Sequence, residues 1–138
     1  KVWAVFIDIY SINDDGNLLD AAGIATIAAL RDAKMPMYNE KEEKVVYGEW
    51  TNKKIPLQKY TPITITLYKI GEKFLVDPTL EEEDVSEARI TMGSYDGTIS
   101  SIQKGGDALI SIKEIEKAGD IIERVWKDIF KKIEKFLK

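Results

Sequence analysis

A strand-like segment, an acidic turn and an Ala-rich helical segment follow one another at the start of this chain, and this order restricts its fold most. Residues 2–12 are mostly β-branched or aromatic, which predicts a largely buried strand. Residues 13–17 (Asn-Asp-Asp-Gly-Asn) predict a turn, in which Gly16 can adopt positive φ. A helix is predicted from there to about Lys34, and its small residues permit close approach to a sheet or another helix.

The start of this helix is where proteins often bind phosphate with backbone N–H groups. The side chains there are Asn17, Leu18 and Leu19, of which none is basic and two are apolar. Asn17 is instead a helix cap, with Asp20 three residues later in the reciprocal position. The turn therefore has the position of a phosphate site without the cation that such a site needs.

Composition limits the chemistry that this chain can perform. Its 138 residues, 44% hydrophobic and 32% charged, predict one globular domain without a membrane span or a leader peptide. The net charge of −4 argues against nucleic-acid binding by the whole surface. Cysteine and histidine are absent, so thiol chemistry is excluded, the commonest zinc ligands are missing, and an intracellular setting is the default.

Two further expectations follow from the chain's beginning and from its composition. The predicted strand begins at Val2, which leads us to expect an upstream part of a larger protein. The abundance of Lys, Glu and Ile, together with the lack of Cys and His, indicates a heat-adapted source.

The middle of the chain predicts hairpins. The least regular region suggests one from Val45–Trp50 and Lys54–Leu57. A second joins residues 62–70 to residues 74–77 through Gly71, and an acidic connection with helical character follows over residues 78–87.

The last third predicts a hairpin and a long helix. Residues 88–92 and 98–103 flank an Asp-Gly turn at residues 96–97, and Gly105-Gly106 ends the second strand. Ser111 and Glu114 form a capping box, after which apolar residues recur at helical spacing to the end of the chain. The fold predicted from this order is α+β, with helices packed on one mixed sheet.

Several segments are candidates for metal, phosphate or RNA binding. The acidic run at residues 77–84 could bind magnesium or supply a general acid, but a solvated connection is favoured. The loop at residues 11–16 fails as a calcium loop, because Ala22 falls where a bidentate Glu is needed. Gly105-Gly106 lacks phosphate-loop spacing. For two sets of residues a structural role is favoured over RNA binding. They are the helix cations Lys127, Lys131, Lys132, Lys135 and Lys138, and the tryptophans Trp3, Trp50 and Trp126.

Five segments nevertheless resemble segments of one known family, and they occur along the chain in the same order as in that family. They are Phe6–Ala25, Ala33–Pro36, Pro62–Thr66, Val76–Glu83 and Ile102–Gly106. The chain resembles the C-terminal half of an RNase PH-like subunit, of the non-catalytic type found in the archaeal exosome. The resemblance implies an RNase PH-like fold that is incomplete at the N-terminus: a ribosomal protein S5 domain 2-like half and a C-terminal RNase PH subdomain. The implied parts are 1–36 (first subdomain), 37–61 (connection) and 62–138 (second subdomain).

The resemblance also implies degenerate site positions. Catalytic relatives carry Gly-Gly/Ala-Thr/Ser-Arg where this chain has Gly16-Asn17-Leu18-Leu19, and Leu19 cannot supply the bidentate contacts of an arginine. Their paired aspartates fall on Asp77 and Glu83, and the extra methylene could misplace the second carboxylate by about an ångström, at a cost on the order of a hundredfold. The expectation is no catalytic, phosphate-binding or metal-binding residue and no cofactor, and no RNA-contact residue is assigned.

The implied function is structural. In the family, catalytic and non-catalytic subunits alternate in a hetero-hexameric cytoplasmic ring that degrades RNA from its 3′ end with phosphate, and RNA-binding cap subunits can join it. The expected partners are thus the catalytic subunit and, through the assembly, RNA, with no membrane. Two alternatives stay open: a weakly active metal-dependent phosphorolytic exoribonuclease using Asp77 with Glu83 or Asp84, and an isolated or engineered fragment that self-associates.

Overall fold

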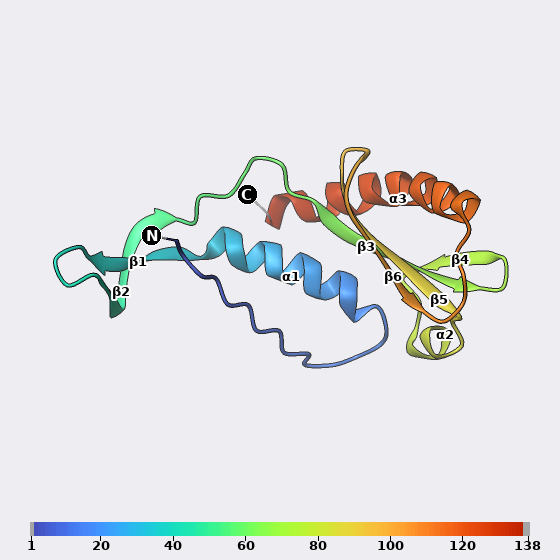
Figure 1. Cartoon of the computed structure of the whole chain (residues 1–138), viewed down its shortest axis with the longest axis horizontal. Helices are drawn as coiled ribbons and strands as arrows, with labels where there is room; N and C mark the ends of the chain where they lie inside the picture. The colour runs from blue at the N-terminus through green and yellow to red at the C-terminus, as the bar shows by residue number, and fades with distance from the viewer. Residues whose placement is uncertain (1, 137–138) are drawn as a thin grey trace.

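The computed structural model describes residues 2–136 as two antiparallel sheets with helices on both sides of the larger one (Figure 1). The elements in chain order are α1 (Leu18–Asp32), β1 (Lys34–Asn39), β2 (Lys44–Lys54), β3 (Ile63–Ile70), β4 (Lys73–Val76), α2 (Leu80–Asp84), β5 (Ala88–Tyr95), β6 (Thr98–Gly106), α3 (Ile112–Ile133) and the 3₁₀ turn η1 (Glu134–Phe136). The predicted α+β class is confirmed.

The larger sheet has the strand order β4-β3-β5-β6, and every neighbouring pair in it is antiparallel. The prediction of one mixed sheet is therefore wrong in two respects. The larger sheet is antiparallel rather than mixed, and β1 and β2 form a separate two-stranded sheet. Tight turns explain the antiparallel order: a two-residue turn reverses the chain, whereas a parallel neighbour needs a long crossover. Asp96 and Gly97 form such a turn with φ values of 45° and 78°, as their sequence predicts.

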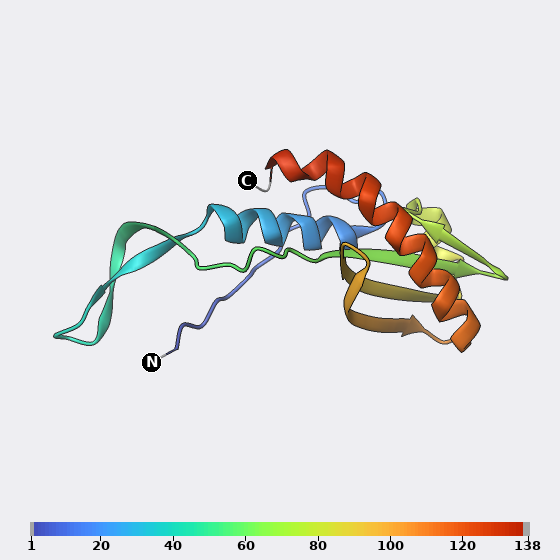
Figure 2. The same ribbon diagram turned by 90° about the horizontal axis from the view of Figure 1, so that it is seen from above.

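Alternation along β3 separates an apolar side from a polar side. Ile63, Ile65 and Leu67 are fully buried, and they form a cluster with Ile90 and Met92 of β5 and with α3. The members contributed by α3 are Ala118, Ile122 and Trp126. On the other side of β3, Thr64 and Thr66 face α1, so α1 and α3 lie on opposite sides of the strand (Figures 1 and 2).

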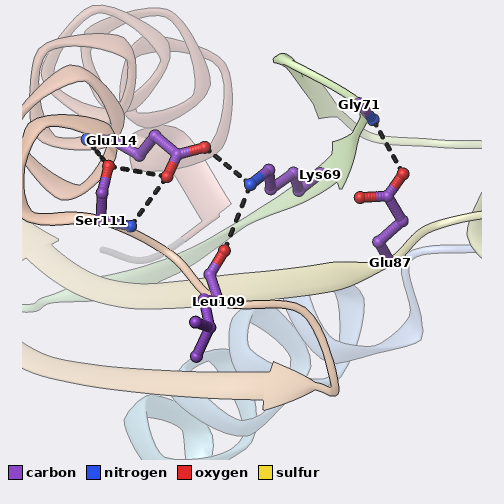
Figure 3. A network of polar contacts seen from close by, with 6 residues as sticks. All are labelled: Lys69, Gly71, Glu87, Leu109, Ser111 and Glu114. Carbon is purple, nitrogen blue, oxygen red and sulfur yellow. Dashed lines mark hydrogen bonds and ion pairs between the residues drawn. The ribbon is translucent and has the colours of Figure 1, made fainter.

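The start of α3 is fixed by the predicted capping box. The Ser111 side chain accepts from Glu114 N at 3.3 Å, and the Glu114 carboxylate accepts from Ser111 N at 2.7 Å. Lys69 of β3 joins this network, with its Nζ 2.7 Å from Glu114 Oε1 and 3.2 Å from Leu109 O (Figure 3). Hydrogen bonds from Lys69 and Ser111 lower the pKa of Glu114 to about 2. The network ties the helix end to the sheet.

The predicted strand at residues 2–12 is wrong. This segment is assigned no strand, and its apolar side chains are exposed: Val2 by 98%, Phe6 by 87% and Ile12 by 99%. A strand needs a neighbour to hydrogen-bond its N–H and C=O groups, and none of the residues from 2 to 136 forms a ladder with it. The β-type composition of this segment is thus not matched by β pairing with any other described residue.

The hairpin predicted from Val45–Trp50 and Lys54–Leu57 is also wrong. Residues 44–54 form one continuous strand, β2, whose partner is β1. Pro36 lies in β1 opposite Trp50, between two register shifts, where a strand tolerates a missing N–H. The Asn39 side chain accepts from the N–H groups of Lys41 and Glu42 and closes the turn. The β1–β2 ribbon projects away from the larger sheet (Figure 2).

Candidate functional site

The structure brings the predicted phosphate turn and the start of the acidic run together. Gly16 has a φ of +92°, and a Cβ placed there would lie 2.3 Å from the carbonyl oxygen of Pro78. Only glycine fits both this backbone conformation and this close approach. The Gly16–Leu19 turn therefore lies directly against the backbone that follows Asp77.

Asn17 joins the two segments through its side chain. Its Nδ2 donates to Asp77 Oδ1 at 3.0 Å, across 60 residues of sequence, and to Asp20 Oδ2 at 3.2 Å. Asn17 occupies the N-cap position of α1, as predicted, but it has a left-handed backbone and makes no capping hydrogen bond. Asn17 is 7% exposed, and its Nδ2 is committed to two carboxylates, while its Oδ1 accepts no hydrogen bond from the helix N–H groups.

Asp20 has a role that the sequence did not reveal. Its carboxylate accepts from Thr66 N at 2.9 Å and from Thr66 Oγ1 at 2.8 Å, and Thr66 Oγ1 lies 3.0 Å from Thr91 Oγ1. Burial raises the pKa of Asp20, the charge of Asp77 acts in the same direction, and the hydrogen bonds from Thr66 and Asn17 oppose the shift. An acid in the first turn of an Ala-rich helix is the available signal, and by itself it predicts only a role in the cap.

The two predicted acidic positions have different partners. Asp77 is exposed at the end of β4, has a φ of 55°, and interacts with Asn17. Glu83 lies in α2 and accepts a hydrogen bond from the Tyr68 hydroxyl. Burial, followed by this bond to Glu83, raises the pKa of Tyr68. The neighbouring Thr79 and Glu82 form a capping box for α2, so part of the acidic run is structural.

No cation balances these carboxylates in the part of the chain that the structure describes: the ion pairs there do not include Asp20, Asp77 or Glu83. Leu18 and Leu19, which are 38% and 42% exposed, add only apolar surface beside them. Within residues 2–136, no group of three or more Asp, Glu, His or Cys side chains is placed to hold a metal ion.

The remaining candidates have structural roles in this fold. A Cβ on Gly105 would lie 2.9 Å from the guanidinium carbon of Arg89, and one on Gly106 would lie 2.7 Å from the Ala88 Cα, so these glycines allow β5 and β6 to pack. Lys127 pairs with Glu123 at 2.8 Å. Lys138 lies outside the described residues.

The tryptophans differ from one another. Trp126 is 6% exposed and belongs to the core, as predicted. Trp3 and Trp50 are 50% and 64% exposed, and Trp3 makes an edge contact with Tyr38. None of the described helices has both the length and the apolar character needed to cross a lipid bilayer.

Comparisons with known proteins agree with this geometry. The RNase PH-like class defined by the sheet and its helices is matched by two family models, "3′ exoribonuclease family, domain 1" at residues 1–36 and "domain 2" at residues 60–121. The Exosome complex component Rrp42 of Methanothermobacter thermautotrophicus is 39% identical over 127 residues, which cover 91% of this chain and 46% of the relative. The chain belongs to the 3′ exoribonuclease family.

Solved structures give the same result. The Archaeoglobus fulgidus exosome with RNA bound to the active site contains a chain similar to this one, with a TM-score of 0.69, 31% identity, and coverage of 88% of this chain and 45% of that one. An archaeal exosome core contains another, with a TM-score of 0.70, 30% identity, and coverage of 92% and 47%. The chain spans about half the length of the relatives and structures that it matches.

Proposed function

We propose that this chain is part of a non-catalytic, structural subunit of an archaeal exosome ring, which supports 3′-to-5′ phosphorolytic RNA degradation in the cytoplasm. Its proposed partners are a catalytic RNase PH-like subunit in a hetero-hexamer, RNA-binding cap subunits, and RNA through the assembly. The relatives and solved structures carry exosome names, which favours this function over a free enzyme or a self-associating fragment. The division of the chain into parts 1–36, 37–61 and 62–138 stays a prediction. Helix α1 of the first part contacts strand β3 of the last part.

The observation that carries the non-catalytic assignment is the lack of a cationic side chain at residues 17–19, beside the carboxylates of Asp77 and Asp20. A phosphorolytic site must attract inorganic phosphate, an anion, to the start of α1. Here Asp77 and Asp20 both approach the Asn17 amide, and two carboxylates would repel phosphate. Leu18 and Leu19 offer no donor to offset this repulsion. We therefore assign no phosphate-binding role to Asn17, Leu18 or Leu19.

The acidic pair also fits catalysis poorly. Asp77 interacts with the α1 turn, whereas Glu83 interacts with Tyr68 on β3, so the two carboxylates have separate partners. Paired carboxylates act on one reacting group only when both are positioned against it. We propose that Asp77 and Glu83 are degenerate catalytic positions, and that Asp77 now connects the acidic run to α1.

A phosphorolysis assay tests the proposal. The chain is incubated with 3′-labelled RNA, inorganic phosphate and magnesium, with or without an archaeal catalytic RNase PH-like subunit. We expect no nucleoside diphosphate from the chain alone, and we expect Asp77→Ala to leave the activity of the mixture unchanged. Asp107→Ala, at an exposed acid outside the site, is the matched control. Nucleoside diphosphate released by the chain alone, and lost in Asp77→Ala but not in Asp107→Ala, would establish the enzymatic alternative instead.

A further inference from the structure

A pocket lies at the start of β3, beside the β5–β6 turn. We name it the Tyr60–Tyr95 pocket; it has a volume of about 470 Å³. The residues that line it are Gln58, Tyr60, Pro62, Tyr95, Asp96, Thr98 and Ser100. They come from the segment before β3 and from the β5–β6 turn, which are far apart in sequence. Nothing in the proposed function uses this pocket.

Aromatic packing holds one wall of the pocket in place. The Tyr95 ring lies 5.5 Å from the Trp126 ring and 6.1 Å from the Phe130 ring, both in edge contact, while Trp126 and Phe130 stack at 4.7 Å. Tyr60 meets Tyr95 edge-on at 5.2 Å and is 63% exposed. The Tyr95 ring, held by Trp126 and Phe130, thus supports the Tyr60 ring, which faces solvent. Because Tyr95 is already held in place, a ligand does not have to order it on binding.

The charge of the pocket has one sign. Among residues 2–136, Asp96 is the only charged residue that lines it, and the other polar lining groups are the Gln58 amide and hydroxyl groups, all able to accept hydrogen bonds. Lys127 is near enough to interact electrostatically with Asp96, but its ion pair at 2.8 Å is with Glu123. Among the described residues, Asp96 therefore has no ion pair of its own.

This combination selects for a cation. The faces of aromatic rings attract positive charge, and arginine is the side chain that both stacks on rings and binds a carboxylate through two N–H groups. A single-stranded RNA base could also stack on Tyr60, but its phosphates would approach Asp96 with no lining cation to neutralise them. We propose that the Tyr60–Tyr95 pocket binds an arginine side chain presented by a segment of a partner protein.

The test uses two peptides that differ only in charge. The isotope-labelled chain is titrated with acetyl-Gly-Arg-Gly-amide and, separately, with the uncharged peptide in which citrulline replaces arginine, and backbone amide shifts are followed by NMR. We expect saturable shifts at Tyr60, Asp96 and Thr98 with the arginine peptide at millimolar concentration. The citrulline peptide should bind several-fold more weakly, because it keeps the shape and loses the charge.

Two variants locate the binding. Asp96→Asn keeps the turn, since Asn tolerates the left-handed backbone, and Tyr60→Leu removes the exposed ring. Each should weaken binding of the arginine peptide by about two- to fivefold, as expected for one cation–π contact or one exposed charge pair. Asp107→Asn should leave it unchanged. Equal binding of the citrulline peptide, no saturable shifts, or shifts at this pocket with oligouridylate and not with the arginine peptide would each overturn the proposal.

Discussion

The α3-covered sheet and the N-terminal segment contain similar residues but bury them very differently. Ile63, Ile65 and Leu67 of β3 are fully buried, because β5 pairs with the strand and α3 covers its apolar side. Residues 2–12 have a comparable β-branched and aromatic composition, and yet Phe6 and Ile12 are largely exposed. The difference teaches that composition gives a segment its preference for a strand, whereas burial depends on having a neighbour.

The β1–β2 ribbon lies between these two extremes. Its strands pair with each other along one edge, but Tyr47 and Trp50 are exposed because none of the described helices covers the ribbon. A two-stranded sheet without a packed face is at most marginally stable by itself. We therefore expect the stability of the chain to reside in the larger sheet and α3, and three comparisons test this expectation.

The largest effect is expected from truncating the core. Ile65→Ala should lower the free energy of unfolding by about 2–5 kcal/mol, because Ile65 is fully buried between β5 and α3. The matched variant Phe6→Ala removes a larger side chain that is 87% exposed, and it should change stability by less than about 0.5 kcal/mol. Urea unfolding followed by circular dichroism measures both. Equal losses would show that residues 2–12 contribute to the core after all.

A smaller effect is expected where the N-terminal segment joins the body of the protein. Gly16→Ala should cost about 2–3 kcal/mol, because the backbone is strained for alanine and the new Cβ would meet Pro78 O at 2.3 Å. Gly48→Ala in the ribbon is the control: its φ is +79°, but no atom lies within 4 Å of the added Cβ, so only the conformational cost of about 1–2 kcal/mol remains. Thermal unfolding of the two variants should rank them in this order.

The smallest effect is electrostatic and depends on pH. The folded pKa of Glu114 is about 2, below its ordinary value of 4.5, so its contribution to stability is present above pH 4.5 and is lost as the pH falls toward 2. Glu114→Gln should remove this part of the acid destabilisation. Lys54 also lowers the pKa of Asp32, but these side chains are 51% and 95% exposed, so Asp32→Asn should change the profile less. Urea unfolding between about pH 2 and pH 6 measures both profiles, and an equal response would contradict the comparison.

Local chemistry was enough to predict the elements that are stabilised locally. The Ser111–Glu114 capping box, the Asp-Gly turn at residues 96–97 and the apolar periodicity of α3 each involve residues close in sequence. The errors lie where distant or absent neighbours decide the outcome. Residues 2–12 have no pairing strand in the part of the chain that the structure describes, and the partner of β2 begins before Pro36, a residue that usually interrupts strands.

The candidate site shows the same limit. Residue types at the start of α1 predicted the missing cation, but not that Asn17 would donate to Asp77, a contact between residues 60 positions apart. The resemblance to RNase PH-like subunits selected Asn17 and Asp77 as family positions without giving their contact. The bonds between Asp20 and Thr66 could not be predicted, because a helix and a strand 46 residues apart must first pack together.

The Asp20–Thr66 contact bears on how α1 is aligned along β3. The face of α1 toward β3 includes Gly23, where an added Cβ would lie 2.2 Å from Thr64 Oγ1, so the helix approaches the strand closely. The Asp20 carboxylate accepts from one particular main-chain amide and from the hydroxyl of the same residue, and a slip in either direction would leave that charge unsolvated and unbonded. The directional contact between Asp20 and Thr66 thereby favours one alignment of α1 along β3.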